Sequence, residues 1–341
     1  MAEDSSAPQR RFRFGRIVAV IIVVLLVGLG AGVGLNVLIA KPQPDKPTSK
    51  KKPSSSNNTG SSSPSSSATK AASKSQFQVG QAMAHTYALT EQVGARPAGS
   101  GNESAAGNYI SQRLAEFGYN VEEQPFSLPE GYGDRNIIAT RTGTKDGYTI
   151  VIGAHYDSAT DSKGAINNAS GTGVLLELAR DFAKRRMQPT LKFAFFGGNR
   201  PGIQDQKARL LGSNRFVDLL GTMDKKDIVG MISIDSVGAG DILALRTQET
   251  GLQRLKDKLA TYADESGVPV QRMKATDDSD NIPFEDAEVP AVWVEWCQAG
   301  GVLPPGDSMA SVVPQKEEAV GKLVESFLLG LTLNDLEELK Y

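Results

Sequence analysis

From about Gln76 to the end of the chain, short apolar runs alternate with segments whose apolar residues recur at helical spacing. The runs are bounded by turn residues and are too short for helices, so each of them predicts a strand. Strands that alternate with helices predict a three-layer α/β/α sandwich around a mixed, mostly parallel central sheet. We expect strands at 121–128, 136–143, 148–156, 190–198, 228–235 and 290–296, and helices at 102–118, 171–186, 210–219, 251–265 and 315–329.

Ile17–Ala40 is an uncharged apolar run that exceeds the ~20 residues needed for a helix to cross a bilayer. A buried core helix is a poor interpretation, because nothing N-terminal to the run can cover it. A cleaved signal peptide is the real alternative. Small residues suited to cleavage are not clearly placed before Ala31 or Lys41. We therefore predict one transmembrane helix that is retained as an anchor.

Residues 41–76 are rich in Ser, Pro and Lys, which predicts a disordered, solvated linker. Basic residues lie on both sides of the apolar run, so their count does not orient it. A spacer of this kind suits a domain held away from a membrane. We expect a short basic cytoplasmic tail at 1–16 and an extracytoplasmic domain at 77–341, which no internal repeat divides.

The composition excludes several classes of site. Cys297 is the only cysteine, so an internal disulfide and a Cys-rich zinc module are both excluded. We expect Cys297 to be a small buried apolar residue. The formal net charge of −2 provides no basic footprint for nucleic acid.

Polar residues stand where three of the predicted strands end: His155, Asn199 and Asp235. Ligands of open α/β sheets bind beyond the carboxyl ends of the strands, so we expect these side chains to meet. A two-metal hydrolase needs a bridging carboxylate, His and carboxylate ligands for each cation, and a further Glu as the base. His155 and Asp235 suit metal ligation, and Asp157 suits orientation of the imidazole.

Fragments in a fixed order carry a resemblance to a known family. They are ARPAGSGNESAAGNYISQRLAEFGYNVEEQPF, GAHYDS, NNASGTGVLLELAR, TLKFAFFGG, LLGSNRFV, SIDSVG, SDNIPF and LPPGDS. Together they resemble the zinc aminopeptidases of the leucyl-aminopeptidase and glutamate-carboxypeptidase type, metallopeptidase family twenty-eight. The resemblance runs from about Ala84 to the C-terminus and implies a zinc-exopeptidase-like fold.

Carried over position by position, the resemblance keeps part of the metal site. His155 matches a zinc-binding His, Asp157 matches the Asp that supports it, and Asp235 matches the strand-end Asp. Ser279-Asp280-Asn281 matches a Ser-Asp-His motif that lines the pocket. Asp280 and Asn281, together with Asp307 of LPPGDS, are therefore predicted pocket residues.

The remaining positions of the motif have changed. The bridging carboxylate falls on Asn167, the catalytic base on Asn199, the next metal ligand on Arg200 and the last His ligand on Leu303. An amide has no usable basicity, and an aliphatic side chain binds no metal. Two unit charges ~4 Å apart repel by about 4 kcal/mol at an effective dielectric of 20, and a divalent ion beside Arg200 would meet roughly twice that.

This pattern predicts a degenerate, catalytically inactive member of the family. No cofactor is expected, or at most one weakly bound zinc ion held by His155, Asn167 and Asp235. We further hypothesise that the Arg200 guanidinium replaces the metal charge and pairs with Asp235 or Asp157.

The predicted function is that of a membrane-tethered pseudopeptidase whose cleft binds a peptide end, another anionic group or a partner protein. Two alternatives stay open. One is a residual metallopeptidase that uses a single metal at His155 and Asp235. The other is a scaffold of the cell envelope whose cleft is unused.

Several other residues favour structural roles. His85 lies in an amphipathic segment, where helix or surface packing is expected, and Trp293 and Trp296 are expected in the core and at its rim. Gly171-Thr172-Gly173 lacks a following Lys and predicts close helix–strand packing instead of a phosphate loop. Ser170 favours a role at the start of a helix.

Overall fold

The computed structural model describes residues 75–200, 203, 206–248, 250–275 and 279–341. The predicted tail (1–16), the membrane anchor (17–40) and almost all of the linker (41–76) lie outside these residues and stay predictions. Within the described part of the chain, no helix is both long and apolar enough to span a bilayer.

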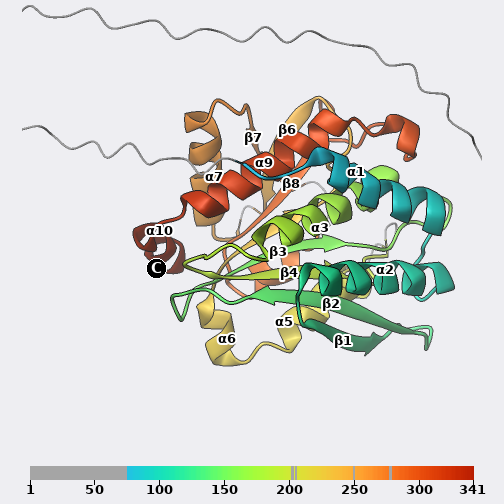
Figure 1. Ribbon diagram of the computed structural model, residues 1–341, viewed down its shortest axis with the longest axis horizontal. Coiled ribbons are helices and arrows are strands. Elements are labelled where there is room, and N and C mark those ends of the chain that lie inside the picture. The colour runs from blue at the N-terminus through green and yellow to red at the C-terminus, as the bar shows by residue number, and fades with distance from the viewer. Residues whose placement is uncertain (1–74, 201–202, 204–205, 249, 276–278) are drawn as a thin grey trace, which may run out of the picture. The chain divides into compact units, whose positions relative to one another are not determined.

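A twisted sheet of eight strands forms the centre of the domain, in the order β1-β2-β4-β3-β5-β8-β6-β7 (Figure 1). The four central strands β4, β3, β5 and β8 run parallel to one another. The antiparallel pairs are β1 with β2, β2 with β4, and β6 with β8. The predicted mixed, mostly parallel sheet is therefore confirmed. The strands are β1 (Val121–Ser127), β2 (Gly133–Arg141), β3 (Thr149–His155), β4 (Thr190–Phe196), β5 (Ile228–Ile234), β6 (Ile242–Thr247), β7 (Gln271–Lys274) and β8 (Ala291–Cys297).

Helices cover both faces of this sheet. One layer contains α1, α2, α3, α7 and α9, and the opposite layer contains α5, α6 and α8. Their bounds are α1 (Val79–Tyr87), α2 (Gly101–Phe117), α3 (Gly171–Phe182), α4 (Gln206–Arg209), α5 (Leu211–Asp218), α6 (Thr222–Asp227), α7 (Arg254–Glu265), α8 (Ile282–Asp286), α9 (Pro314–Gly330) and α10 (Leu333–Lys340). Short π or 3₁₀ segments lie at Ala88–Val93 and Met309–Ser311, and a kinked segment with a non-helical backbone at Asn167 and Asn168 lies at Ala165–Ser170.

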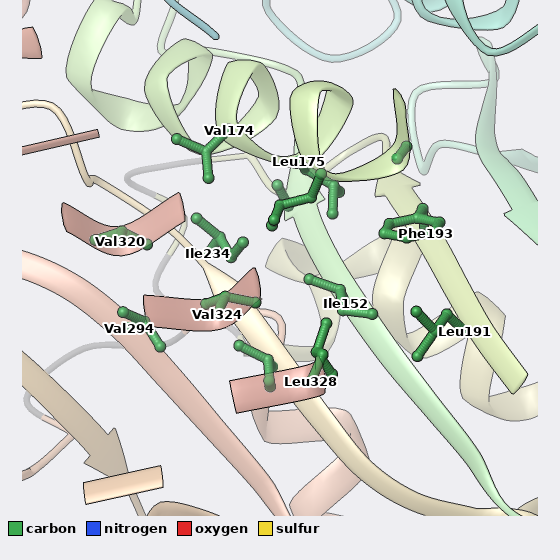
Figure 2. Packing of buried hydrophobic residues seen from close by; sticks show 14 of the residues in the cluster. Ile152, Val174, Leu175, Leu191, Phe193, Ile234, Val294, Val320, Val324 and Leu328 are labelled. Atoms are coloured by element: carbon green, nitrogen blue, oxygen red, sulfur yellow. The ribbon is translucent and has the colours of Figure 1, made fainter. Parts of the chain in front are cut away.

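The larger core lies between the sheet and α3 and α9. Figure 2 shows Ile152 of β3 and Ile234 of β5 facing Leu175 of α3 and Val324 of α9. Strand residues alternate between the two faces of a sheet, so Val151, next to Ile152, belongs to the opposite core. Central strands that are buried on both faces explain the continuous apolar runs in the sequence.

The smaller core on the opposite face is built around three aromatic rings. Phe196 of β4, Phe216 of α5 and Phe284 of α8 lie with ring centroids 5.5–6.3 Å apart. This contact fixes α5 and α8 against the sheet. It also anchors the chain just before α8, where the predicted pocket residues Asp280 and Asn281 stand.

All six predicted strands and all five predicted helices are present, with ends that differ by a few residues. The strands β6 and β7 were not predicted. In β6 the apolar run ILALRT contains a charged residue, Arg246, which is buried against Glu295. The edge strand β7 has the polar sequence QRMK, which gives no apolar signal.

Gly171, the first residue of α3, allows that helix to start directly against the end of β5. A Cβ at this position would lie 2.2 Å from the carbonyl oxygen of Ile234. The predicted close helix–strand packing is therefore confirmed. Ser170 precedes the helix as expected but caps no helix N–H; its hydroxyl accepts the N–H of Val237 at 3.1 Å instead.

Candidate functional site

The carboxyl ends of β3 and β5 bring two of the predicted site residues together. His155 is the last residue of β3, and Asp235 directly follows β5. The imidazole Nε2 of His155 lies 3.7 Å from Oδ1 of Asp235. Both side chains are buried, so their interaction is only weakly screened by water.

His155 lies between two carboxylates. Its Nδ1 is 3.0 Å from Oδ1 of Asp157, on the opposite side of the ring from Asp235. Burial by itself lowers the pKa of His155, but the nearby charge of Asp235 and the hydrogen bond to Asp157 outweigh burial and raise the pKa well above its usual value. Both neighbouring carboxylates therefore favour the protonated imidazolium form of His155 over the neutral ring.

Asp235 is held in its ionised form. Burial would raise the pKa of this carboxyl, but the charge of His155 and hydrogen bonds from two serine hydroxyls lower the pKa below its ordinary value. Ser279 donates to Oδ2 at 2.8 Å, and Ser236 donates to Oδ1 at 2.9 Å. The carboxylate oxygens that a metal would use are thus engaged by a cation and two hydroxyl groups.

Asp157 also shapes the loop after β4. Its two oxygens accept the backbone N–H groups of Asn199 at 3.1 Å and of Arg200 at 2.8 Å. The loop therefore approaches His155 through its main chain. Asn199, at the position of the catalytic base, is buried, and its side-chain Nδ2 has no hydrogen-bond partner among the described residues.

The hypothesis for the Arg200 side chain was wrong. Its guanidinium pairs with Glu130 and donates to the carbonyl oxygen of Ala208 at 3.1 Å, away from Asp157 and Asp235. The physical reason is that both acids already have charged or N–H partners, while Glu130 offers an unpaired carboxylate at the rim. The cation between the acids is therefore His155.

The loop that contains Asn167 is tied down by Asp307. One oxygen of Asp307 accepts the backbone N–H groups of Ile166 and Asn167, and the other accepts the Ser162 hydroxyl at 2.8 Å. The amide oxygen Oδ1 of Asn167 is buried and has no partner in the described part of the chain. Leu303 lies on the surface with 41% of its area exposed.

Asp280 is buried beside this cluster, and neither carboxylate oxygen has a hydrogen bond of good geometry with a described residue. Burial raises the pKa of Asp280 to about 7, against the opposing effects of His155 and Ser213. The neighbouring Asn281 donates from Nδ2 to Glu285 at 2.6 Å. Asp280 thus lies near His155 and Asp235, whereas Asn281 turns its amide group toward Glu285 of α8.

Sequence reasoning missed two buried charged residues that hold the site in place. The Arg96 guanidinium donates to the carbonyl oxygens of Tyr156 at 2.7 Å and Gly164 at 2.9 Å, among others, and so fixes the loop after β3. Glu103 accepts the N–H of Gly198, just before Asn199. Burial, with the charges of Asp157 and Asp134, raises the pKa of Glu103 to about 10. Both residues stand in the first fragment of the resemblance, but an isolated Arg or Glu there carries no sign of its partners.

These residues do not fit the two zinc ions of an intact family member. Catalytic zinc sites use three protein ligands from His and carboxylates, and among the described residues no three His, Cys, Asp or Glu side chains lie close enough to share an ion. The 3.7 Å between His155 and Asp235 leaves room for one ion, but its third protein donor would be the neutral amide of Asn167. The second ion would have neither a bridging carboxylate nor its Glu and His.

His85, the only other histidine, lies in α1 and packs between helices, as predicted. Its Nδ1 is 2.6 Å from the Tyr109 hydroxyl, and its ring meets Tyr109 and Phe117 edge-on. Trp293 is buried, Trp296 is half-buried, and Cys297 is fully buried, which also agrees with the predictions.

Comparison with known proteins supports this description of the fold. Residues 136–320 match the model of Peptidase family M28. The chain is 28% identical over 202 residues to leupeptin-inactivating enzyme 1 of Streptomyces exfoliatus, which covers 58% of the chain and 43% of that enzyme. It is 28% identical over 185 residues to aminopeptidase YwaD of Bacillus subtilis, which covers 51% of the chain and 39% of that protein. The chain thus spans less than half the length of these two relatives.

Solved structures share the fold at low sequence identity. A zinc aminopeptidase from Bacillus subtilis superposes with a TM-score of 0.68 at 17% identity and covers 74% of this chain and 94% of its own. A glutaminyl cyclase from Bacteroides thetaiotaomicron gives 0.67 at 21% identity, with 76% and 99% covered. Since the family model spans more than half of the sequence, the chain belongs to peptidase family M28, the family of the zinc aminopeptidases.

Proposed function

We propose that the protein is a membrane-anchored, extracytoplasmic pseudopeptidase that binds a peptide end or a partner protein without cleaving it. The observation that carries this proposal is the His155 ring between Asp157 and Asp235. A protonated imidazole supplies the positive charge that these acids would otherwise need from a metal. The inherited pocket is therefore electrostatically satisfied by the chain itself.

Two parts of the family's hydrolytic machinery, the base and several metal ligands, are missing from the matching positions among the described residues. Peptide hydrolysis by a metallopeptidase needs a water made nucleophilic by a metal and a base that removes its proton. The base position holds Asn199, whose amide cannot accept a proton at neutral pH. Arg200 and Leu303 supply no ligand, and their side chains lie at the rim and on the surface.

A ligand would enter through a pocket of about 240 Å³ next to the site. Its wall includes Arg200 and Glu130, which are paired, together with Ser158, Tyr132 and Ile203. A charged pair beside exposed apolar side chains suits the terminus and first side chain of a peptide. This geometry supports binding of a peptide end over an unused cleft.

A second candidate is residual single-metal peptidase activity. It is favoured by the buried, unpartnered amide oxygen of Asn167 and by the 3.7 Å between His155 and Asp235. A metal held there by His155, Asp235 and Asn167 would first have to displace the proton from His155, which costs more the higher its pKa lies. This cost makes the non-catalytic function the better-supported one.

The experiment that separates the two candidates is metal analysis of the purified full chain, together with an assay on aminoacyl p-nitroanilides. We expect far less than one zinc per chain and no hydrolysis that a chelator abolishes. One equivalent of zinc with chelator-sensitive cleavage would establish the single-metal peptidase and exclude our proposal.

Membrane anchorage rests on the sequence of Ile17–Ala40 alone. When the full chain is expressed in cells, it should stay in the membrane pellet after alkaline carbonate extraction. Protease added outside intact cells should degrade its globular domain. Release as a soluble, shortened chain would instead support cleavage of a signal peptide.

A further inference from the structure

A groove of about 680 Å³ lies at the end of the sheet opposite His155. It is bordered by Ile228, the first residue of β5, by α6 and by the end of α10. Figure 1 shows α6 and α10 at the same end of the domain. The candidate site lies beyond the last residue of β5, so the groove is separate from it.

The helix α6 that forms one wall is weakly embedded in the domain. None of its side chains is buried, and Met223 has 69% of its surface exposed. A second hollow of about 250 Å³ also borders this segment and shares Leu220, Asp227 and Ile228 with the groove. A helix bordered by hollows and held by few apolar contacts gains stability when a partner fills the space beside it.

The groove carries an excess of positive charge. Lys225, Lys226 and Arg254 line it, and none of the three side chains forms an ion pair with a residue in the described part of the chain. The Nε of Arg254 is buried and also has no partner there. The fourth cation, Lys340, pairs with Asp227 at 3.5 Å, which leaves Glu288 as the opposing side-chain carboxylate of the wall.

Apolar side chains lie between these cations. Leu220, Met223, Ala287 and Pro290 line the groove, and the ring of Tyr341 borders it with 87% of its surface exposed. A flat lipid surface meets protruding side chains, whereas a concave groove that mixes cations with apolar groups fits a protein segment.

We infer that this groove is a docking site for a segment of a partner protein in which acidic side chains flank an apolar one. The acidic groups would pair with Lys225, Lys226 and Arg254, and the apolar residue would pack against Met223 and Pro290. The volume is in the range that holds a short peptide segment, about 300–1,000 Å³. The inference does not depend on the proposed function, because it uses the opposite end of the sheet.

The test is a selection of random dodecapeptides, displayed on phage, against the immobilised full chain. We expect a consensus with two or more Asp or Glu residues around one large apolar residue. The synthetic consensus peptide should bind about tenfold or more weakly to the double variant Lys225→Glu, Lys226→Glu and to Met223→Asp. Its affinity should also fall as salt rises.

Matched controls use exposed residues outside the groove, Lys184→Glu for charge and Tyr87→Asp for the apolar change. Both should bind the peptide as the native chain does. A neutral or basic consensus, no enrichment at all, or equal binding to all variants would overturn the inference. Two further ligands could occupy the groove instead: anionic phospholipid vesicles or a second copy of the chain. The inference would be overturned if either of them bound the native chain, lost its binding in the double variant Lys225→Glu, Lys226→Glu, and was not displaced by the peptide. Binding lost on changing His155 alone would point to the other site.

Discussion

The two histidines of this chain lie in opposite electrostatic settings. His155 stands between Asp157 and Asp235, while His85 is buried among aromatic rings near the cations Arg113 and Arg180. Burial, with those two arginines, lowers the pKa of His85 to about 4. The same residue type is therefore a cation in one place and neutral in the other.

This contrast gives a prediction that one NMR experiment can check. At pH 6.5, long-range ¹⁵N–¹H spectra of the two imidazoles should show a cationic ring for His155 and a neutral ring for His85. The raised pKa of His155 means that its contribution to stability is complete below the ordinary value of ~6.5 and is lost only as pH rises through the folded-state value. Two rings that both titrate near 6.5 would contradict the described site.

Glu317 of α9 provides a second prediction for a single residue. Its side chain is fully buried, one oxygen accepts the Thr86 hydroxyl at 2.9 Å, and the other has no described partner. Burial raises the pKa of this carboxyl to about 8. The native state therefore holds a proton that the unfolded chain releases above its own pKa of about 4.5, so stability falls as pH rises between these values.

Replacing Glu317 with Gln removes this titration and keeps the acceptor for Thr86. Relative to the native chain, Glu317→Gln should gain stability from about pH 4.5 upward and level off above pH 8, by an amount on the order of 5 kcal/mol. Urea unfolding at pH 5 and pH 9 measures the change. The adjacent Glu318→Gln, whose pair with Lys322 is on the surface, should shift stability by less than ~1 kcal/mol. An equal effect of Glu317→Gln at both pH values would show that Glu317 is ionised in the fold.

Among the elements, strand β6 is joined to β8 by a buried ion pair as well as by backbone pairing. Arg246 of β6 pairs with Glu295 of β8, and its guanidinium lies 5.3 Å from the centre of the Trp293 ring. Burial raises the pKa of Glu295 to about 7, against the charge of Arg246. Removal of the arginine leaves a buried acid without its cation.

We therefore predict that Arg246→Met destabilises the domain by about 3–5 kcal/mol at neutral pH, because it leaves Glu295 unpaired. The double variant Arg246→Met, Glu295→Met should recover most of that loss, since neither charge of this pair is then left buried without its partner. Thermal or urea unfolding of the three chains measures both effects. Lys322→Met, on an exposed pair, serves as the surface control. A double variant as unstable as the single one would show that Arg246 acts through its other contacts.

The elements also show which part of the fold could be predicted from the sequence. The central strands β3, β4, β5 and β8 are buried on both faces, so each appears as an uninterrupted apolar run. Strand β6 escaped prediction because its charge is neutralised by Glu295, a residue 49 positions further along the chain. Partners so distant leave no mark in the local sequence.

The sequence predicted where the site residues lie in the fold, but it predicted only some of their side-chain contacts. Parallel strands end at one edge, so the meeting of His155 with Asp235 followed from the topology. The direction of the Arg200 side chain did not, because it depends on Glu130, in the turn between β1 and β2. The roles of Arg96 and Glu103 depend on hydrogen bonds to backbone groups. Every residue has such groups, so the sequence does not indicate which of them these side chains contact.

At the scale of the whole molecule, the changed positions should act together. We predict that Asn167→Asp, Asn199→Glu, Arg200→Glu and Leu303→His, combined in one chain, raise zinc affinity by a large factor, while each single change has little effect. The reason is that zinc needs three or more donors at once. Zinc per chain after dialysis, with circular dichroism to verify folding, measures the gain. A folded quadruple variant that takes up no more zinc than the native chain would remove the assignment of these positions.

A site whose positive charge comes from a proton can form in any aqueous compartment, whereas a zinc site can form only where zinc is supplied. In metalloproteins the free energy of folding includes the binding of the ion and so depends on its supply. In the proposed function, the positive charge between Asp157 and Asp235 comes from His155, whose proton is supplied by water. The domain should consequently mature at the same rate in cells starved of zinc and in cells that are replete, with acidity, and not metal supply, as the external variable to which its interior responds.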